Sequence, residues 1–519
     1  MDYLDYVQMT KGQRFAYKLK SFFTGIPGAI VKFFKAIGFF IKKFFLGIGH
    51  FFKNYGTRFA KGDIGTKLSY VIMGAGSIMH GQIVKGLILL ATEVGYIAFM
   101  IGFGAKYIER ICVSKITTLT WTPEVVNGTP YIVRGTNTVG KTVKQVVDDG
   151  FSQYVANEGK YDESNKVLLF FVLTMIVTLA FFIIYIANTK TAYNTQLLRA
   201  EGKKPIGFVD EMKTFLDDRF HITLLTLPIV LLIVFNILPI LFTILMAFTN
   251  YDKAHDGQIR LYQWVGFQNF AEVFYADAKK SKTFGLVLVW TLIWAFFATF
   301  TNFIFGIILA LLINKKDIKF KGFWRTMFVV TAAVPQFVTL LVMRLLLNDT
   351  GGFNAAFGTH IPFLSDANWA RVTIIVVNMW VGIPYTMLIS SGLLMNIPED
   401  LYESARIDGA NAVQQFTKIT FPYIFFVLTP YLITTFVGNV NNFNVIYFLT
   451  GGGPGDTINY SNAAGQTDLL VTWLYKLTAD QKDYKLAAVI GILVFIVCAI
   501  GSLITFNMSK AAKNEEEFS

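Results

Sequence analysis

Apolar residues gather along this chain in blocks that are long enough to predict membrane-crossing helices. A helix needs about 20 predominantly apolar residues to cross the hydrocarbon core of a bilayer. Eight blocks meet this requirement, so the sequence predicts an all-α polytopic membrane protein with about eight transmembrane helices. The predicted spans are residues 84–104, 167–187, 223–248, 284–314, 323–348, 371–395, 423–450 and 486–506.

The spans divide the chain into parts of different character. An arm precedes the first span, a long polar segment separates the first two spans, and the remaining six form one core. The expected parts are an N-terminal arm (1–82), a first span (83–104), a small extracytoplasmic domain (105–166), a second span with a loop (167–222), a core (223–506) and a tail (507–519).

The N-terminal arm shows a helical pattern of its own. From Phe22 to Phe59, apolar residues recur every three or four positions, which is the spacing of one helix face. A Phe-rich face opposite a Lys-rich face is typical of a helix lying in the membrane interface, and packing on the transmembrane helices is the alternative. Leu68 to Met79 is too short to cross and is expected to form a second interfacial or re-entrant piece. The lysines opposite the apolar face are Lys32, Lys35, Lys42, Lys43 and Lys53, and the glycines expected to break the helix are Gly25, Gly28, Gly38, Gly47 and Gly49.

Composition agrees with a membrane location. Of the 519 residues, 54% are hydrophobic and 15% are charged, whereas soluble domains carry about 25% charged residues. Two cysteines exclude a disulfide framework, and five histidines without paired spacing give no zinc site. The net charge of +12 follows from the positive-inside rule and anionic lipid rather than from nucleic acid. The basic loop 315–321 marks a cytoplasmic side, which places both termini in the cytoplasm.

The segment 105–166 combines β-branched runs with turn residues, so a small strand-containing cap is expected there. It also contains Gly135 to Thr142, which matches the phosphate-binding pattern GxxxxGK[ST]. About sixty residues cannot supply the parallel sheet that supports such a loop, and the predicted orientation places it outside the cell. We therefore interpret the match as fortuitous and expect nucleotide to bind separate chains.

Two of the later spans carry polar residues at depths where polarity is costly. Residues 378–385 contain a Gly and a Pro expected to interrupt the helix beside Tyr385, and residues 438–444 contain four asparagines. Asn439 and Asn442 are three positions apart and would share a helix face. Hydrogen bonding between helices is one explanation. The other is a cavity for an uncharged polyhydroxyl solute, since neutral amides and aromatic rings suit sugars.

The stretch 397–422 is a polar island between two spans, with helix boundaries of its own. Pro398 suits a first helical position, Gly409 a left-handed stop, and Asn411 with Gln414 a capping box. Pro422 is expected to close the second helix. The pattern predicts two short helices that need a partner surface, because neither is long enough to be stable alone.

This island resembles the EAA loop of ABC-importer permeases. Glu403, Ala405, Gly409, Ile419 and Pro422 fall at the family's spacing, and Ser404 and Phe421 depart mildly from it. The resemblance implies a type I importer core, with a loop that docks in a separate ATPase subunit. The ATPase-coupling residues it implies are Glu403, Ala405, Asp408, Gly409 and Ala410.

From the sixth span onward the chain resembles the larger (MalF-type) permease subunit of maltose importers. The matching stretches are residues 382–385, 397–422, 439–454 and 467–476. Gly438 stands where that subunit has an aromatic residue, and the loop 249–283 is short where it has a large periplasmic domain. The sugar-binding residues that the resemblance implies are Val381, Gly382, Tyr385, Thr435, Gly438, Asn439 and Asn442.

The resemblance also implies the partners: a second homologous permease subunit, a homodimeric ABC ATPase, an extracytoplasmic solute-binding protein, membrane lipid and the sugar. No cofactor, metal or enzyme site is expected in this chain, and ATP and Mg would bind the ATPase. One alternative is an ion-coupled secondary transporter, which would need acidic or histidine residues within its spans, where Glu93 is the main example. The other is the same role for a solute that is not a sugar.

Overall fold

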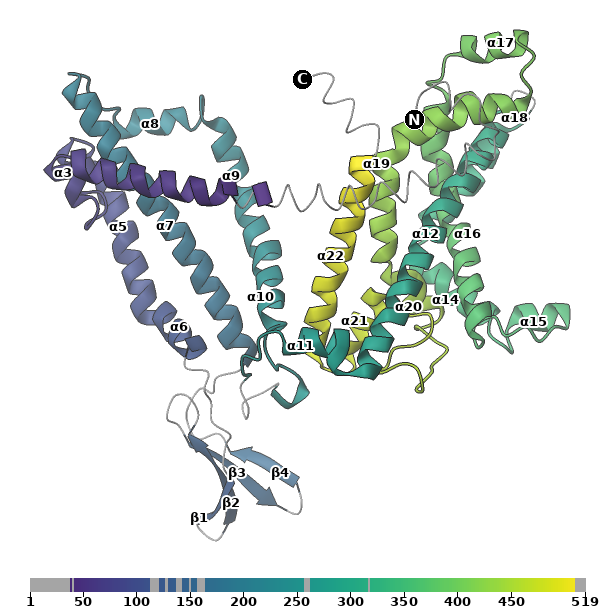
Figure 1. The fold of residues 1–519 in the computed structure, drawn as a ribbon, viewed down its shortest axis with the longest axis horizontal. Helices are drawn as coiled ribbons and strands as arrows, with labels where there is room; N and C mark the ends of the chain where they lie inside the picture. Colours follow the sequence, from purple (N-terminus) through teal and green to yellow (C-terminus); the bar gives the residue numbers. More distant parts are fainter. Residues whose placement is uncertain are drawn as a thin grey trace. The chain divides into compact units, whose positions relative to one another are not determined.

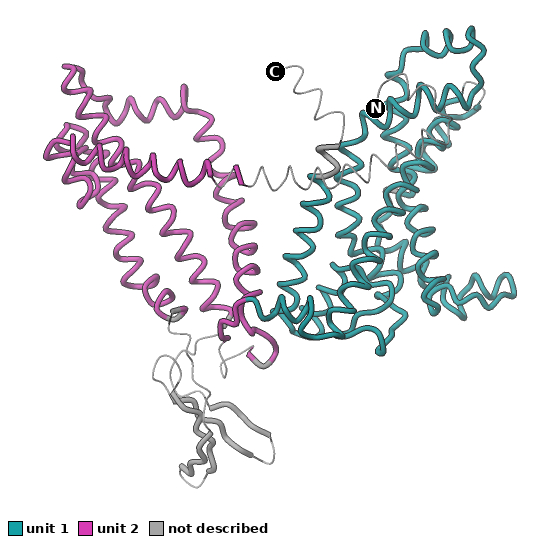
Figure 2. The backbone as a smooth tube through the Cα atoms, in the orientation of Figure 1, with its two compact units in different colours: residues 1–31, 267–519 teal, residues 32–266 magenta. Residues whose placement is uncertain are grey.

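The computed structural model describes residues 38–39, 42–112, 121–126, 129–136, 142–148, 151–155, 164–255, 262–315 and 318–508. The chain divides into two compact units, one of residues 32–266 and one of residues 267–519 together with 1–31 (Figure 2). We call them the N-terminal unit and the C-terminal unit.

Most described residues of both units are helical. Within the described residues, seven helices are long and apolar enough to cross a membrane, and a bent pair makes an eighth if it counts as one span. The predicted fold class, an all-α core with about eight spans, is therefore confirmed. The seven helices are Ile83–Glu109, Asn165–Ala200, Phe220–Met246, Ala278–Asn314, Ala367–Leu394, Ala412–Leu449 and Tyr484–Leu503.

The bent pair corrects the fifth predicted span. We expected one membrane-crossing helix over 323–348, but α13 (Lys321–Ala333) and α14 (Gln336–Leu346) meet at an angle of 82°. Val334 between them is extended, and Pro335 precedes α14. Proline disfavours the helical conformation of the residue before it, so the helix ends at this point.

In the N-terminal unit, residues 42–61 form one helix that continues through Gly47 and Gly49. The breaks expected there are wrong, because a glycine inside a helix costs only about 1 kcal/mol and packing can offset that cost. One packing contact is the hydrogen bond of 3.0 Å between the hydroxyls of Tyr55 and Tyr185, which lies on α7 (Ser164–Ala200). The arm before residue 38 lies outside the described residues.

The stretch after this helix folds tightly onto α7. It forms α3 (Ile64–Leu68) and α4 (Ala75–Met79) before α5 (Ile83–Phe99) begins. Asn188 on α7 accepts a hydrogen bond from the Gly74 N–H (3.1 Å) and donates one to the Ser69 carbonyl (3.1 Å). Gly74 has a φ of +84°, and a Cβ there would overlap the Gly86 carbonyl. The piece expected over Leu68–Met79 thus consists of the end of α3, a turn and α4, and it contacts α7.

The remaining elements of the N-terminal unit include a small sheet, as expected for the segment 105–166. It is antiparallel, in the order β1-β2-β3-β4. Thr142 of the GxxxxGKT match begins strand β3 rather than the helix that a phosphate-binding loop requires. The bounds are α6 (Ala105–Cys112), β1 (Trp121–Val126), β2 (Thr129–Thr136), β3 (Thr142–Asp148), β4 (Phe151–Val155), α8 (Phe208–Thr214), α9 (Phe220–Leu232), α10 (Leu238–Met246), the π-helical turns η1 (Met100–Gly104) and η2 (Ile233–Ile237), and the 3-10 helix η3 (Lys253–His255).

The C-terminal unit is built around α12 (Ala278–Asn314), which packs along α16 (Ala367–Leu394) and against α19 (Phe421–Val440) (Figure 1). Phe303 and Ile307 of α12 are buried with Ile424, Leu428 and Leu432 of α19. The other bounds are α11 (Gln268–Ala271), η4 (Glu272–Ala276), α15 (Gly352–Phe357), α17 (Glu399–Ile407), α18 (Ala412–Gln415), η5 (Phe416–Thr420), α20 (Phe443–Leu449), α21 (Leu470–Ala479) and α22 (Tyr484–Met508).

Two prolines do not act as expected. Pro384 lies inside α16, which continues without interruption for 28 residues. Pro422 lies in the first turn of α19, and a π-helical turn (η5) joins that helix directly to α18. Pro422 therefore does not close the second helix of the island. A proline lacks only its backbone N–H, which leaves one carbonyl of the preceding turn without its usual hydrogen bond. In membrane proteins, a π-helical turn or a neighbouring helix can accommodate that carbonyl.

Candidate functional site

The predicted sugar-binding residues lie on neighbouring elements of the C-terminal unit. Val381, Gly382 and Tyr385 belong to α16, Thr435, Gly438 and Asn439 belong to α19, and Asn442 precedes α20. The rings of Tyr385 and Tyr431 of α19 are 6.4 Å apart. Tyr385 is 55% exposed, and a Cβ on Gly438 would meet no atom within 4 Å. Tyr385 and Gly438 therefore have open surroundings within this chain.

The two asparagines do not share a helix face, because α19 ends at Val440 and Asn442 caps α20. Asn439 is buried and donates to the Thr299 hydroxyl of α12 (3.0 Å), while the Trp294 indole donates to its backbone carbonyl (3.0 Å). The Asn442 amide donates to Asn439 Oδ1 (3.4 Å) and accepts from the Val445 N–H (3.2 Å). Both side chains thus hold the helices together, and a sugar would compete for or add to these bonds.

Gly382 has a packing role that the sequence did not reveal. A Cβ on Gly382 would overlap the side-chain amide of Asn302 on α12, and a Cβ on Gly306 would lie 2.6 Å from the Cβ of Thr386 on α16. Ala298, Asn302 and Gly306 are spaced by four residues, so they lie on one face of α12. Small residues at this spacing let helices in a membrane approach closely. A side chain at position 382 would therefore have to displace the Asn302 amide from the contact between α12 and α16.

Of the predicted coupling residues, Glu403 and Ala405 lie on α17. Asp408, Gly409 and Ala410 form the turn between α17 and α18, where Gly409 has a φ of +78°. The Gly409 N–H donates to the Arg406 carbonyl (3.0 Å), and the Ala410 N–H to the Ala405 carbonyl (2.8 Å). The predicted capping box of Asn411 and Gln414 is present. Helix α17 begins at Glu399, one residue later than expected, with Pro398 as its N-cap.

Helices α17 and α18 expose three large apolar side chains. Ile407 is 87% exposed, Val413 69% and Leu401 51%, and Glu403, Asp408 and Gly409 are exposed beside them. The Tyr402 hydroxyl lies 2.8 Å from that of Thr420 and ties α17 to the base of the loop. Exposed apolar side chains of this size on a short, anchored helix are typical of a surface that docks on a partner.

Comparison with known proteins places these features in a family. A family described as "Binding-protein-dependent transport system inner membrane component" matches residues 302–512. The galactooligosaccharides transport permease GanP of Bacillus subtilis is 39% identical over 66% of this chain and 83% of its own. The maltodextrin transport permease MdxF of the same species is 36% identical over 86% of this chain and 95% of its own.

The chain belongs to the family of binding-protein-dependent transport permeases. Within that family it is of the MalF type, since MalF of Vibrio vulnificus is 36% identical over 48% of this chain and 49% of its own. Among solved structures, a chain of a bacterial alginate ABC transporter has a TM-score of 0.47 at 22% identity, covering 58% of this chain and 97% of that one.

Several residues of the permease core were missed by the sequence analysis. Asn302 is buried in the middle of an apolar helix, and its Oδ1 has no hydrogen-bond partner among the described residues. The rule that singled out Asn439 and Asn442, polarity inside a span, would also have found Asn302. The exposure of Ile407 had no such signal, because the exposure of a side chain cannot be read from the sequence. The described residues contain no group of three His, Cys, Asp or Glu placed to hold a metal ion.

Proposed function

We propose that this permease is the larger membrane subunit of an ATP-driven importer for an uncharged oligosaccharide of the maltodextrin class. The observation that carries the proposal is the similarity to MdxF, which spans 95% of that maltodextrin permease. GanP, named for galactooligosaccharides, supports an oligosaccharide but not one particular linkage. Within this class, the missing aromatic ring at Gly438 favours a longer or branched sugar.

The chain would form half of the translocation path, and a second homologous permease the other half. A separate homodimeric ATPase would bind ATP and Mg and dock on α17 and its exposed Ile407. The basic loop 315–321 supports a cytoplasmic location for this surface and for both termini. An extracytoplasmic solute-binding protein would deliver the sugar at the opposite end.

The main competing function, ion-coupled transport, would use a carboxylate within a span. Glu93 in α5 is the principal candidate, and its Oε2 accepts a hydrogen bond from the Met73 N–H at 2.8 Å. This bond fixes the turn before α4, which gives Glu93 a structural task. We therefore favour energy from ATP over energy from an ion gradient.

Uptake of labelled maltotriose by cells that express the complete transporter separates the two. We expect uptake to stop on ATP depletion or vanadate and to survive an uncoupler that dissipates the ion gradients. Loss of uptake with the uncoupler at unchanged cellular ATP would contradict the proposal. Competition with mono-, di- and trisaccharides and with amino acids tests the solute class in the same assay.

A further inference from the structure

The helix over residues 42–61, which we call the arm helix, packs on the rest of the N-terminal unit through one of its faces. The Tyr55 hydroxyl lies 3.0 Å from that of Tyr185 on α7, and the Tyr70 hydroxyl donates to the Tyr55 carbonyl (3.0 Å). The ring of Phe51 stacks on that of Tyr55, with the centroids 6.0 Å apart. Phe51 and Tyr55 are one turn apart and share a face. Packing on the transmembrane helices therefore accounts for this face alone.

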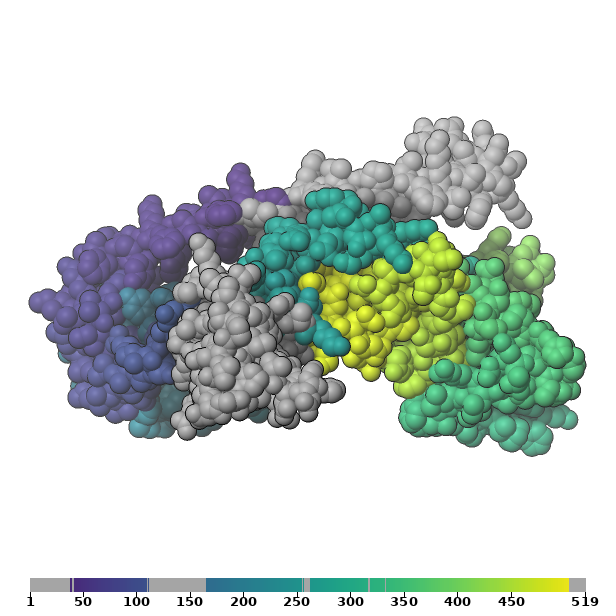
Figure 3. Space-filling view, turned by 90° about the horizontal axis from the view of Figure 1, so that it is seen from below, coloured from purple at the N-terminus to yellow at the C-terminus, as the bar shows by residue number. Residues whose placement is uncertain are grey.

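These contacts place the arm helix at the level where α7 leaves the apolar part of the membrane. Tyr185 is two positions before the end of the apolar block 167–187, and the polar residues Asn188 and Thr189 follow that block. The arm helix runs across α7 rather than alongside it (Figure 1). The purple residues of the arm form one edge of the N-terminal unit in Figure 3. A helix in this position lies in the membrane interface, where tyrosine is enriched.

A second face of the arm helix carries large apolar side chains that remain exposed. Phe45 is 65% exposed, and Phe52 is 63% exposed. The two are seven positions apart, so at about 100° per residue they point in nearly the same direction. Phe44, which is 56% exposed, lies beside them. Aromatic side chains gathered on one exposed face require an apolar environment outside the chain.

Lysines flank these exposed phenylalanines. Lys42 and Lys53 are eleven positions apart, which puts them on one side of the helix, about 80° from the direction of Phe45 and Phe52. Both lysines are exposed, and neither side chain has a hydrogen bond or ion pair to any described residue. Lysines beside apolar rings can bury their carbon chains and extend their ammonium groups to the level of lipid headgroups.

The arm helix has no acidic residue to neutralise these lysines. The sequence contains no Asp or Glu between Asp5 and Asp63. One oxygen of Asp63 accepts from the Thr66 N–H (2.7 Å), and the other lies 2.8 Å from Nε2 of His80. Asp63 is ten positions after Lys53, or about 15 Å along a helix. That distance exceeds the Debye length of about 8 Å at physiological ionic strength.

We propose that the arm helix binds anionic phospholipid, with Phe45 and Phe52 among the acyl chains and Lys42 and Lys53 on the phosphate groups. A bilayer offers acyl chains and negative headgroups side by side along a surface, which is the arrangement that the two faces of the helix match. The positive charge selects an anionic headgroup such as phosphatidylglycerol over zwitterionic phosphatidylcholine. The proposal does not depend on which solute the permease carries.

Fluorescence quenching in the complete transporter tests the proposal. The fluorophore NBD is attached to Gly56→Cys, with every other cysteine of the complex replaced. A Cβ on Gly56 meets nothing within 4 Å, and it points between the directions of Phe52 and Lys53. The transporter is placed in phosphatidylcholine nanodiscs that contain phosphatidylglycerol or phosphatidylcholine with a nitroxide at the same position of one acyl chain. We expect the labelled phosphatidylglycerol to quench at a mole fraction at least about fivefold lower, which corresponds to about 1 kcal/mol for one lysine near the surface.

Charge-removing variants assign the selectivity to the two lysines. Lys42→Gln combined with Lys53→Gln should bring the two labelled lipids to within about twofold of each other. Lys203→Gln combined with Lys213→Gln is the matched control, because it removes the same charge from two lysines of the same unit that are already in ion pairs. The control should keep the preference of the wild type. A preference for phosphatidylglycerol that survives the loss of Lys42 and Lys53 would overturn their assigned role.

The quenching itself tests whether the helix reaches the bilayer. Phe45→Ser combined with Phe52→Ser should reduce quenching by both labelled lipids at least about twofold, because the apolar face then no longer holds the helix among the acyl chains. Unchanged quenching would overturn the role of the two rings. No quenching of the wild type by either lipid would show that the arm helix lies off the bilayer, and equal quenching by both would overturn the selectivity for anionic lipid.

Discussion

At the scale of single residues, the most informative position is Gly382, because two explanations compete for its small size. The resemblance to sugar permeases implies that it lines the sugar path, whereas a Cβ on it would overlap the Asn302 amide. The packing explanation rests on a contact within this chain and makes a prediction about stability as well as uptake.

Gly382→Ala should therefore lower the thermal stability of the detergent-solubilised permease. Forcing one extra carbon into a packed helix contact commonly costs about 1–3 kcal/mol. Asn302→Ala removes the overlapping amide, so the double variant should recover much of the lost melting temperature. Gly438→Ala is the control and should melt like the wild type, since its Cβ meets nothing within 4 Å. Equal melting temperatures of Gly382→Ala and the wild type would show that the contact with Asn302 tolerates a side chain at position 382.

Asn442 also combines a structural and a predicted binding role, and its variants can separate them. Asn442→Ala removes the N-cap of α20, which costs about 0.5–2 kcal/mol, and should reduce sugar uptake. Asn442→Ser retains a good cap but shortens the side chain and loses the amide. If the amide binds sugar, the Ser variant should remain impaired and should change the preference among mono-, di- and trisaccharides. Wild-type uptake by the Ser variant would show that Asn442 is only a cap.

At the scale of elements, the helix pair α17 and α18 is a preformed unit with an exposed apolar surface. Its turn requires a left-handed residue at Gly409, and a Cβ there would meet no other atom of the chain. Any steric effect of a side chain at 409 must therefore come from backbone strain or from a partner.

Gly409→Asp should abolish sugar uptake while the chain stays in the membrane at normal abundance. Asn and Asp tolerate the left-handed conformation better than other residues, so backbone strain is small. Gly409→Asn has the same shape without the charge, and comparison of the two separates steric from electrostatic interference. Membrane content is measured by immunoblot, and ATPase association by co-purification. Normal uptake by Gly409→Asp would remove the evidence for coupling through this turn.

At the scale of the whole molecule, the direction in which the chain crosses the membrane determines which partner can reach each end of the C-terminal unit. The proposed ATPase surface on α17 and the segment of α20 and α21 lie at opposite ends of that unit (Figure 1). If the basic loop 315–321 faces the cytoplasm, as we propose, α17 lies on the same side and the opposite end of the unit faces outward.

Labelling of single cysteines tests this orientation. Cysteines at Lys32, Lys43 and Lys53, in a chain whose native cysteines are replaced, should be shielded from membrane-impermeant maleimide added to intact cells. All three should react once the membrane is opened. A cysteine at Lys279, in the first turn of α12, should react in intact cells and serves as the positive control. Labelling of any arm cysteine from outside would reverse the assigned direction of the spans.

The sequence alone determined the features that depend on neighbours a few residues away. The length of the apolar blocks predicted the spans. The period of three to four residues predicted the helix that the structure shows over residues 42–61. Gly409, Asn411 and Gln414 predicted the turn and the capping box. These features follow from hydrogen bonds and backbone angles within one or two helical turns, so they are encoded locally.

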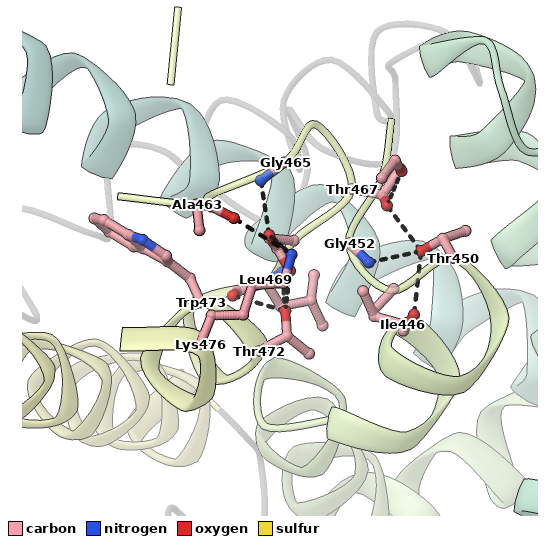
Figure 4. A network of polar contacts seen from close by, with 12 residues as sticks. Ile446, Thr450, Gly452, Ala463, Gly465, Thr467, Leu469, Thr472, Trp473 and Lys476 are labelled. Atoms are coloured by element: carbon pink, nitrogen blue, oxygen red, sulfur yellow. Dashed lines mark hydrogen bonds and ion pairs between the residues drawn. The ribbon is translucent and has the colours of Figure 1, made fainter. Parts of the chain in front are cut away.

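Only the tertiary structure decided which residues from distant parts of the sequence contact one another. Asn439 is hydrogen-bonded to Thr299, 140 positions away, and Gly382 faces Asn302. In the loop between α20 and α21, the buried Asp468 accepts a hydrogen bond from the Gly465 N–H, and a Cβ on Gly452 would overlap its carboxylate (Figure 4). The structure also showed that Pro422 and Pro384 do not end their helices and that Pro335 does precede a sharp bend. Close packing and buried hydrogen bonds depend on which helices meet, and that is a property of the folded chain rather than of any single stretch.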